Sequence, residues 1–168
     1  MKKLIILALT ASLHANLSHA QDVKTSQETD VYASYVENIR QSAEKGSATA
    51  QYTLAGCYYT GKGVEKDFKT AVKWYEKAAK QGVNDAQYDL AICYYKGIGI
   101  KQQLDKAVYW FRKAAEGGNI YAQYQLGVCY YNGKGIERNE ALALEWLNKA
   151  AKAGSTAAIN ALNSIAEN

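Results

Sequence analysis

Apolar residues recur at spacings of three and four along most of the chain, a period that predicts helices rather than strands. Over residues 48–59 the apolar stripe is formed by Ala50, Leu54 and Cys57. Gly61 follows the last apolar position, where a glycine can take the left-handed conformation that closes a helix. The pattern therefore predicts a first helix that ends just before this glycine.

A second helix is predicted to begin near Asp67, whose carboxylate can accept hydrogen bonds from the first free backbone amides. A glycine at position 82 is expected to end it. Its apolar face carries Ala71, Trp74, Tyr75, Ala78 and Ala79. Charged residues occupy the opposite face, as on an ordinary solvated helix. Because such a helix pair leaves apolar surface on both sides, it needs neighbours to bury that surface.

This helix pair is written three times in succession with a period of 36 residues, at 46–81, 82–117 and 118–153. The recurring positions include Ala50/Ala86/Ala122, Gln51/Gln87/Gln123, Leu54/Leu90/Leu126, Tyr58/Tyr94/Tyr130, Gly61/Gly97/Gly133, Gly63/Gly99/Gly135 and Trp74/Trp110/Trp146. A fixed period of this size indicates a stack of repeats rather than one globular core. The predicted fold class is therefore all-α.

Half repeats flank the three copies. The segment Val36–Gly46 aligns with the end of each repeat, and residues 30–45 are therefore predicted to form a lone second helix that caps the N-terminal end of the stack. Residues 154–168 repeat only the first helix, with Asn160 and Glu167 at the places of Tyr52 and Tyr59. Polar residues there suit a terminal helix whose far side faces water.

The first twenty residues are typical of a secretory signal peptide. Lys2 and Lys3 precede an apolar run of about ten residues, which is too short to span a membrane. Small residues, Ser18 and Ala20, stand where a signal peptidase reads, so cleavage is expected after Ala20. We therefore expect export to the periplasm or the cell exterior without membrane insertion, and a flexible lead-in over residues 21–29.

Loss of this segment would remove both histidines of the chain and leave a net charge of about +2. Without histidine there is no Ser/His/Asp or Cys/His relay, and the commonest ligand of zinc and copper is missing. A nearly balanced charge also disfavours nucleic acid as a partner. We expect no cofactor and no metal, and a non-catalytic role.

The three cysteines, Cys57, Cys93 and Cys129, stand at equivalent places in successive repeats. Equivalent positions in stacked helix pairs lie about 9–10 Å apart or more, whereas a disulfide needs Cα atoms within about 7 Å. The spacing therefore predicts three free, buried thiols that fill the core as small apolar groups.

The string Ala-Gln-Tyr-x-Leu-(Ala/Gly)-x-Cys-Tyr-Tyr-x-Gly-x-Gly-(Val/Ile), followed by Ala-x-x-Trp-(Tyr/Phe/Leu)-x-Lys-Ala-Ala, closely resembles the Sel1-like repeat, a relative of the tetratricopeptide repeat with a longer loop. The resemblance covers Gly46 to Asn168. It implies a right-handed α-solenoid whose first helices line a concave surface that binds proteins. Exported members of the family include periplasmic regulators, secreted host-interaction factors and immunity proteins that bind toxins. The resemblance thus implies a protein or peptide partner.

By analogy with the ligand positions of tetratricopeptide repeats, a set of first-helix residues is predicted to line the concave wall. These residues are Tyr52, Tyr59, Asp85, Tyr88, Ile92, Tyr95, Tyr121, Tyr124, Val128 and Tyr131. Rigid amphipathic rings provide contact area at little entropic cost. An alternative for the row of Tyr52 and its equivalents is packing between neighbouring repeats. Tyr58, Tyr94 and Tyr130 are assigned to the core.

A hydrolase is the alternative class of function. Ser42-x-x-Lys45 matches the serine signature of penicillin-interacting enzymes, and some secreted Sel1-like proteins are described as weak β-lactamases. The companion Ser-Asp-Asn and Lys-Thr-Gly strings are missing from the sequence.

Overall fold

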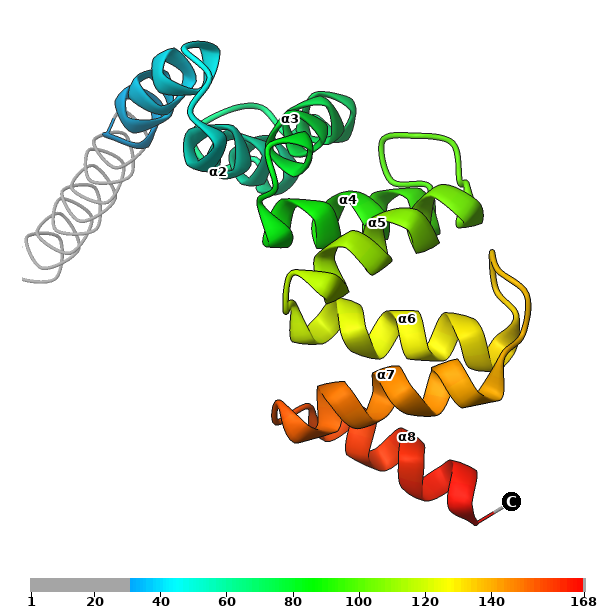
Figure 1. Cartoon of the computed structure of the whole chain (residues 1–168). Helices are drawn as coiled ribbons and strands as arrows, with labels where there is room; N and C mark the ends of the chain where they lie inside the picture. Colours follow the sequence, from blue (N-terminus) through cyan, green and yellow to red (C-terminus); the bar gives the residue numbers. More distant parts are fainter. Residues whose placement is uncertain (1–30, 168) are drawn as a thin grey trace, which may run out of the picture.

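Helices follow one another in consecutive pairs through the part of the chain that the structure, a computed structural model, describes, which is residues 31–167 (Figure 1). A helix over residues 31–44 is followed by α2 (Ala48–Thr60), α3 (Phe68–Lys80), α4 (Asn84–Lys96), α5 (Leu104–Glu116), α6 (Ile120–Asn132), α7 (Glu140–Lys152) and α8 (Thr156–Ala166). The predicted all-α stack of helix pairs is confirmed. The predicted signal peptide and lead-in lie outside the described residues.

Each first helix packs against the second helix of its own repeat, as α2 does with α3, α4 with α5 and α6 with α7. Each second helix also packs against the first helix that follows. A central apolar cluster therefore spans the helix pairs, with a smaller cluster at each end. The most buried side chains include the repeated leucines Leu54, Leu90 and Leu126, all of them 0% exposed.

The second helices begin at the predicted caps. Asp67 accepts hydrogen bonds from the backbone amides of Lys69 and Thr70 at 2.9 and 3.1 Å, and Asn139 accepts one from Leu142 at 3.0 Å. Gln103 occupies the same place before α5 without a side-chain cap, in line with its weaker capping propensity. The three repeats thus share one backbone geometry even where their caps differ.

The second glycine of each loop allows the loop to touch the preceding helix pair. Gly63, Gly99 and Gly135 have φ angles of 73°, 69° and 75°, which disfavour any side chain. A Cβ added at Gly99 would overlap the backbone carbonyl of Phe68, and one at Gly135 that of Leu104. The loop therefore lies directly on the first turn of the second helix in the preceding repeat.

Repeated glutamine side chains add a polar tie at each step of the stack. The Nε2 atoms of Gln51, Gln87 and Gln123 donate to the carbonyls of Ala43, Ala79 and Ala115 at 3.0, 3.1 and 3.2 Å. Each accepting carbonyl lies in the last turn of the preceding second helix, or in the corresponding turn of the N-terminal helix. Each of these carbonyls also accepts from the backbone amide of the glycine three residues later, so the glutamine supplies a second hydrogen bond to it across the junction.

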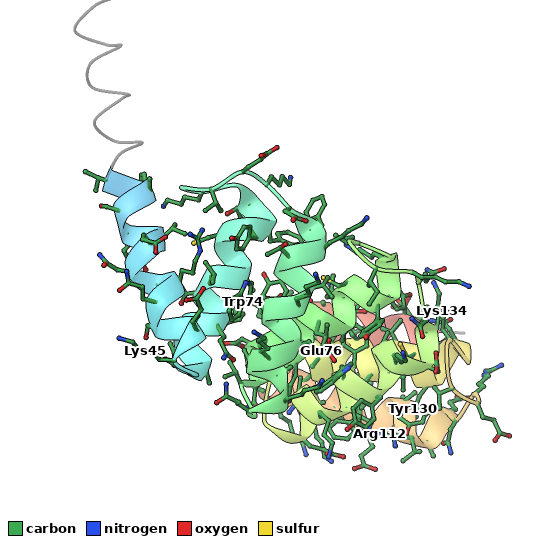
Figure 2. The ribbon with its side chains drawn as sticks, turned by 90° about the horizontal axis from the view of Figure 1, so that it is seen from above. Lys45, Trp74, Glu76, Arg112, Tyr130 and Lys134 are labelled. Carbon is green, nitrogen blue, oxygen red and sulfur yellow. The ribbon has the colours of Figure 1, made fainter. Side chains whose placement is uncertain are left out.

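The N-terminal helix packs as a second helix does. Arg40 donates to the Tyr58 hydroxyl at 3.3 Å, and Arg112, two periods later, donates to the Tyr130 hydroxyl at 2.8 Å. Figure 2 shows Arg112 beside Tyr130. Val36 and Ala43 are each 1% exposed against the first repeat. The N-terminal helix therefore closes part of the apolar face of the first repeat.

Gly99→Ala should reduce the free energy of unfolding by about 2 kcal/mol or more, because alanine is strained at positive φ and its Cβ would displace backbone. Gly56→Ala is the matched control. It lies inside α2 with nothing within 4 Å of an added Cβ, and should stabilise the protein by about 0.5–1 kcal/mol. Urea unfolding measures both changes. Equal effects would contradict the contact between loop and helix.

Candidate functional site

The residues predicted to line the concave wall differ in how far they are uncovered. Tyr121 is the most open, at 69% exposure, and Asp85 is also exposed. The remaining members of the set are half-buried: Tyr52, Tyr59, Tyr88, Ile92, Tyr95, Tyr124, Val128 and Tyr131. The first helices therefore present a row of aromatic rings that are packed on one side and open on the other.

Tyr52 and Tyr88 bridge neighbouring helix pairs. The Tyr52 ring lies 5.9 Å from that of Tyr75 in α3, and its hydroxyl donates to the Asp89 carboxylate in α4. The Tyr88 ring lies 6.0 Å from Phe111 in α5 and 5.9 Å from Tyr121 in α6. This row makes the contact between repeats that the alternative interpretation describes, while part of each ring stays open to solvent.

The row of Tyr59 and its equivalents packs mainly within its own repeat. Tyr59 contacts Phe68 with ring centroids 5.1 Å apart, and Tyr95 contacts Phe111 at 6.1 Å. The Lys134 ammonium lies 4.7 Å from the centre of the Tyr95 ring. Removal of these rings would therefore disturb packing within the repeat as well as change the candidate binding surface.

The last members of the set meet the C-terminal helix. Tyr124 and Val128 pack against the small core that Leu147, Ala150 and Ala158 form with α8. Val128 and Tyr131 also line a cavity of about 270 Å³ beside Ile165. α8 therefore covers part of the aromatic row at this end of the stack.

Asp89 is a charged residue in this surface that the tyrosine pattern did not identify. It lies four residues after Asp85 and next to Tyr88, so helical spacing places it on the same stripe of α4. The hydroxyls of Tyr52 and Tyr75 both donate to its carboxylate. The corresponding second-helix positions hold Phe111 and Leu147, which lack a hydroxyl, so within residues 31–167 this polar cluster exists at one junction only.

Burial is the main influence on the Asp89 carboxyl. It raises the pKa to about 6, the Asp85 carboxylate acts in the same direction, and the two tyrosine hydroxyls act against it. The same surroundings raise the pKa of Tyr52 to about 12. None of the ion pairs among the described residues includes Asp89, so its carboxylate is stabilised by hydroxyl groups rather than by a cation.

Two polar contacts fix the start of α4 to the turn between α5 and α6 along the same surface. Asn119 caps α6 by accepting from the Ala122 amide at 2.8 Å, and its Nδ2 donates to Asp85 at 2.8 Å. Asn84 donates to the Gly117 carbonyl at 2.6 Å. These contacts set the spacing between Tyr88 and Tyr121.

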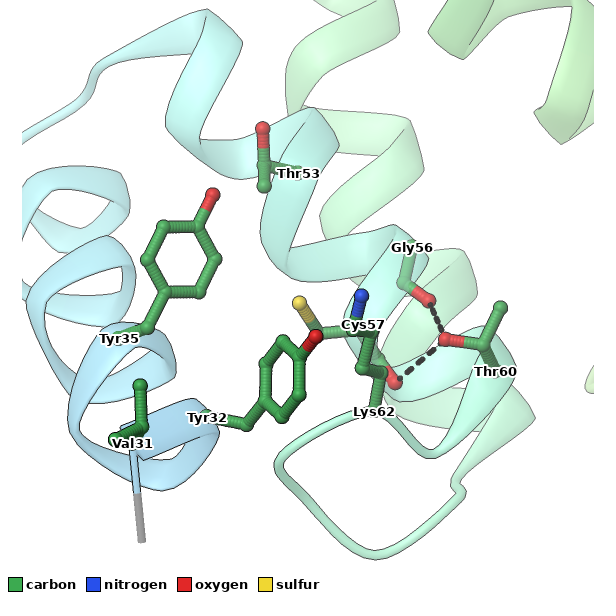
Figure 3. Close-up of a pocket in the computed structure, with 8 residues that line it drawn as sticks. All are labelled: Val31, Tyr32, Tyr35, Thr53, Gly56, Cys57, Thr60 and Lys62. Carbon is green, nitrogen blue, oxygen red and sulfur yellow. Dashed lines mark hydrogen bonds between the residues drawn. The ribbon is translucent and has the colours of Figure 1, made fainter. Parts of the chain in front are cut away.

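A cavity of about 550 Å³ lies at the N-terminal end of the surface, between the N-terminal helix and α2 (Figure 3). The N-terminal helix contributes Val31, Tyr32 and Tyr35, and α2 contributes Thr53, Gly56, Cys57 and Thr60. Figure 3 shows the Cys57 sulfur pointing toward the space between the two tyrosine rings and α2. The lining is mostly apolar.

The three cysteines are free thiols in the structure and differ in accessibility. Cys93 and Cys129 are each 1% exposed, and burial raises their pKa values to about 12 and about 11. Cys57 is 8% exposed, and burial raises its pKa while the Lys62 ammonium acts in the opposite direction. Cys57 is therefore the thiol that solvent reaches most readily.

Ser42 and Lys45 of the hydrolase-like string lie at the end of the N-terminal helix. Ser42 is in its last turn, where its carbonyl accepts from the Ser47 amide at 3.1 Å, and Lys45 is exposed just beyond. Over residues 31–167, no group of three or more His, Cys, Asp or Glu side chains is arranged to hold a metal ion. No helix within the same range has the length and apolar character needed to cross a membrane.

Asp89→Asn should flatten the dependence of stability on pH. Because the folded-state pKa is raised, the carboxyl stabilises the fold fully below pH 4, and this contribution is lost as the pH rises through about 6. The variant should match the wild type near pH 4 and exceed it by about 1–2 kcal/mol at pH 7.5. Urea unfolding at several pH values measures this difference, and parallel profiles would contradict it.

Comparison with known proteins identifies the repeat. The family model described as the Sel1 repeat matches residues 48–83, 84–119 and 120–155, which shifts the predicted boundaries by two residues without changing the period. A search of the curated proteins found no match.

Solved structures agree with that match. The structure of c5321, a protective antigen present in uropathogenic Escherichia coli strains, is 39% identical with a TM-score of 0.74, over 76% of this chain and 27% of that one. A Sel1 repeat protein from Oxalobacter formigenes is 32% identical with a TM-score of 0.72, over 75% and 52%.

The immunity protein Pa5087 from Pseudomonas aeruginosa is 28% identical, with a TM-score of 0.52, over 76% of this chain and 48% of that one. The chain therefore spans about a quarter to a half of the length of these three proteins. Three family matches in tandem cover most of the described helices, and the chain belongs to the Sel1 repeat family.

Proposed function

We propose that this protein is an exported, non-catalytic module that binds a protein partner through the surface of its first helices. The observation that carries the proposal is the row of partly open aromatic rings along α2, α4 and α6, which ends in Tyr121 at 69% exposure. Exposed aromatic side chains grouped on one surface are typical of protein-binding sites. Sel1 repeats are interaction modules in general, which supports the same class of function.

Within this class we favour an immunity or regulatory protein of the periplasm. The likeness to the immunity protein from Pseudomonas aeruginosa supports this choice. Export is supported by the signal-like sequence of residues 1–20. A secreted toxin or a periplasmic regulator would be the partner.

Export predicts a processed N-terminus. Protein recovered from the periplasm of a producing bacterium should begin at Gln21, because the small residues before it suit signal peptidase. Intact-mass and N-terminal peptide measurements identify the first residue. Retention of Met1 on protein in the cytoplasm would contradict export and leave the binding proposal to be judged by the next experiment.

Tyr121→Ala should reduce the recovery of partner proteins at least fivefold, because it removes the most exposed ring of the row at little cost in packing. Tyr109→Ala is the matched control, since Tyr109 is 54% exposed but belongs to the second helix α5. Tagged wild type and both variants would be compared by quantitative mass spectrometry of proteins recovered from periplasmic extract. Equal recovery by all three proteins would overturn the proposed binding surface.

A further inference from the structure

The three first helices carry the same surface toward the preceding repeat, and this surface has an occupant in the interior of the stack. On α4 it is formed by Asp89, Ile92 and Cys93. Tyr52 of α2 donates to Asp89, and Tyr52 and Tyr59 both pack against the buried cluster that contains Cys93. Two tyrosines seven residues apart on one helix therefore approach this surface of the next first helix.

On α2 the same surface is the wall of the cavity. Thr53, Gly56 and Cys57 stand one period before Asp89, Ile92 and Cys93. Within residues 31–167 no first helix precedes α2. The sequence has no upstream copy of the tyrosine pair, since Asn16 and Val23 stand one period before Tyr52 and Tyr59.

The N-terminal helix occupies only part of the space beside α2 that a preceding first helix would fill. The Lys62 ammonium lies 4.3 Å from the centre of the Tyr32 ring, much as Lys134 lies 4.7 Å from that of Tyr95. Tyr32 thus supplies one ring, but it remains 41% exposed, and Tyr35 remains 49% exposed. The cavity of about 550 Å³ lies between these rings and α2, within the size range of sites that hold a ligand.

The wall of the cavity suits close approach by a helix. Gly56 replaces the Ile92 and Val128 of later repeats, and a Cβ added to it would meet nothing within 4 Å. The Cys57 thiol points into the same space, and the residue is 8% exposed (Figure 3). The surface that mediates contact between repeats is therefore also present on α2, where residues 31–167 leave it partly open.

We propose that this cavity receives an amphipathic helix of the partner protein that presents two aromatic side chains seven residues apart. The inference rests on the proposed function and specifies the chemistry of the partner. The docked helix takes the place that α2 takes against α4, and its rings pack against Gly56, Tyr32 and Tyr35. Helix-in-groove recognition of this kind uses anchors on one helical face.

A second copy of the chain fits the cavity less well. Its free first helix is α8, which would have to supply the two anchors. At the equivalent positions α8 carries Asn160 and Glu167, both exposed. Placing an amide and a carboxylate against an apolar wall without hydrogen-bond partners is costly.

The test uses a side-chain-stapled peptide of residues 46–61 with Cys57→Ser, because a free helix of this length is marginal in water. This probe presents Tyr52 and Tyr59 at the required spacing. The matched control peptide also carries Tyr52→Asn and Tyr59→Glu, which reproduce the polar residues of α8. The readout is the rate at which N-ethylmaleimide alkylates Cys57 in the folded, mature protein, followed by mass spectrometry of its peptides.

The tyrosine peptide should slow alkylation of Cys57 at least tenfold at saturation, and the control peptide should leave the rate unchanged. Gly56→Trp in the protein should abolish binding of the fluorescently labelled tyrosine peptide, because the indole fills the cavity. Tyr109→Ala should leave that binding unchanged. Thr60→Arg at the exposed rim is a second variant that should block binding. Circular dichroism verifies that all three variants fold.

Equal protection by both peptides, or protection by neither, would overturn the proposal. Protection that grows with protein concentration alone would assign the cavity to a second copy. If Cys57 is protected without any peptide and this protection disappears when residues 21–30 are deleted, the cavity belongs to the chain's own N-terminal segment. Either result also overturns the proposal. Loss of partner recovery in Tyr121→Ala together with failure of the peptide would leave the proposed function standing and remove this inference.

Discussion

The structure depends on close approach between successive helix pairs. Residues without bulk stand wherever two backbones meet: Gly99 lies on the Phe68 carbonyl, and Gly135 lies on that of Leu104. Inside the core, a Cβ added at Gly127 would come within 2.8 Å of the Leu147 side chain. Helices of thirteen residues are marginal alone in water, so their stability comes from this packing. Each pair holds its neighbour in place, and the equivalent residues fall into rows.

Equivalent residues in successive repeats then differ in their contacts, because the residues around them differ. The second-helix position that holds Tyr75, Phe111 and Leu147 is buried in all three repeats. Of these three residues only Tyr75 has a hydroxyl, and Asp89 accepts a hydrogen bond from it. That arrangement keeps an ionisable group in the surface at a cost in stability near neutral pH. Groups with strongly raised pKa values occur often at functional sites, and Asp89 lies among the rings proposed to contact the partner.

The two ends of the stack are unequal. The C-terminal helix α8 exposes the polar residues Asn160, Asn163 and Ser164, as suits the cap of a repeat protein, beside the exposed Ile159. The N-terminal helix covers the first repeat only in part and leaves Tyr32, Tyr35 and the small wall of α2 beside a cavity. Residues 31–167 thus leave open part of the surface of α2 on which another helix would pack. This asymmetry is why the proposed docking site lies at the N-terminal end of the described residues.

The sequence by itself determined the helices, their period and their caps, because Asp67, Asn139 and the loop glycines act through local backbone chemistry. It also determined the family and placed the tyrosine rows on the first helices. Only the tertiary structure decided which face of each ring is open, because exposure depends on the neighbouring repeat. The cavity beside Gly56 and the contact of Asp89 with Tyr52 and Tyr75 join residues of different helices, and a one-dimensional period carries no information about such junctions.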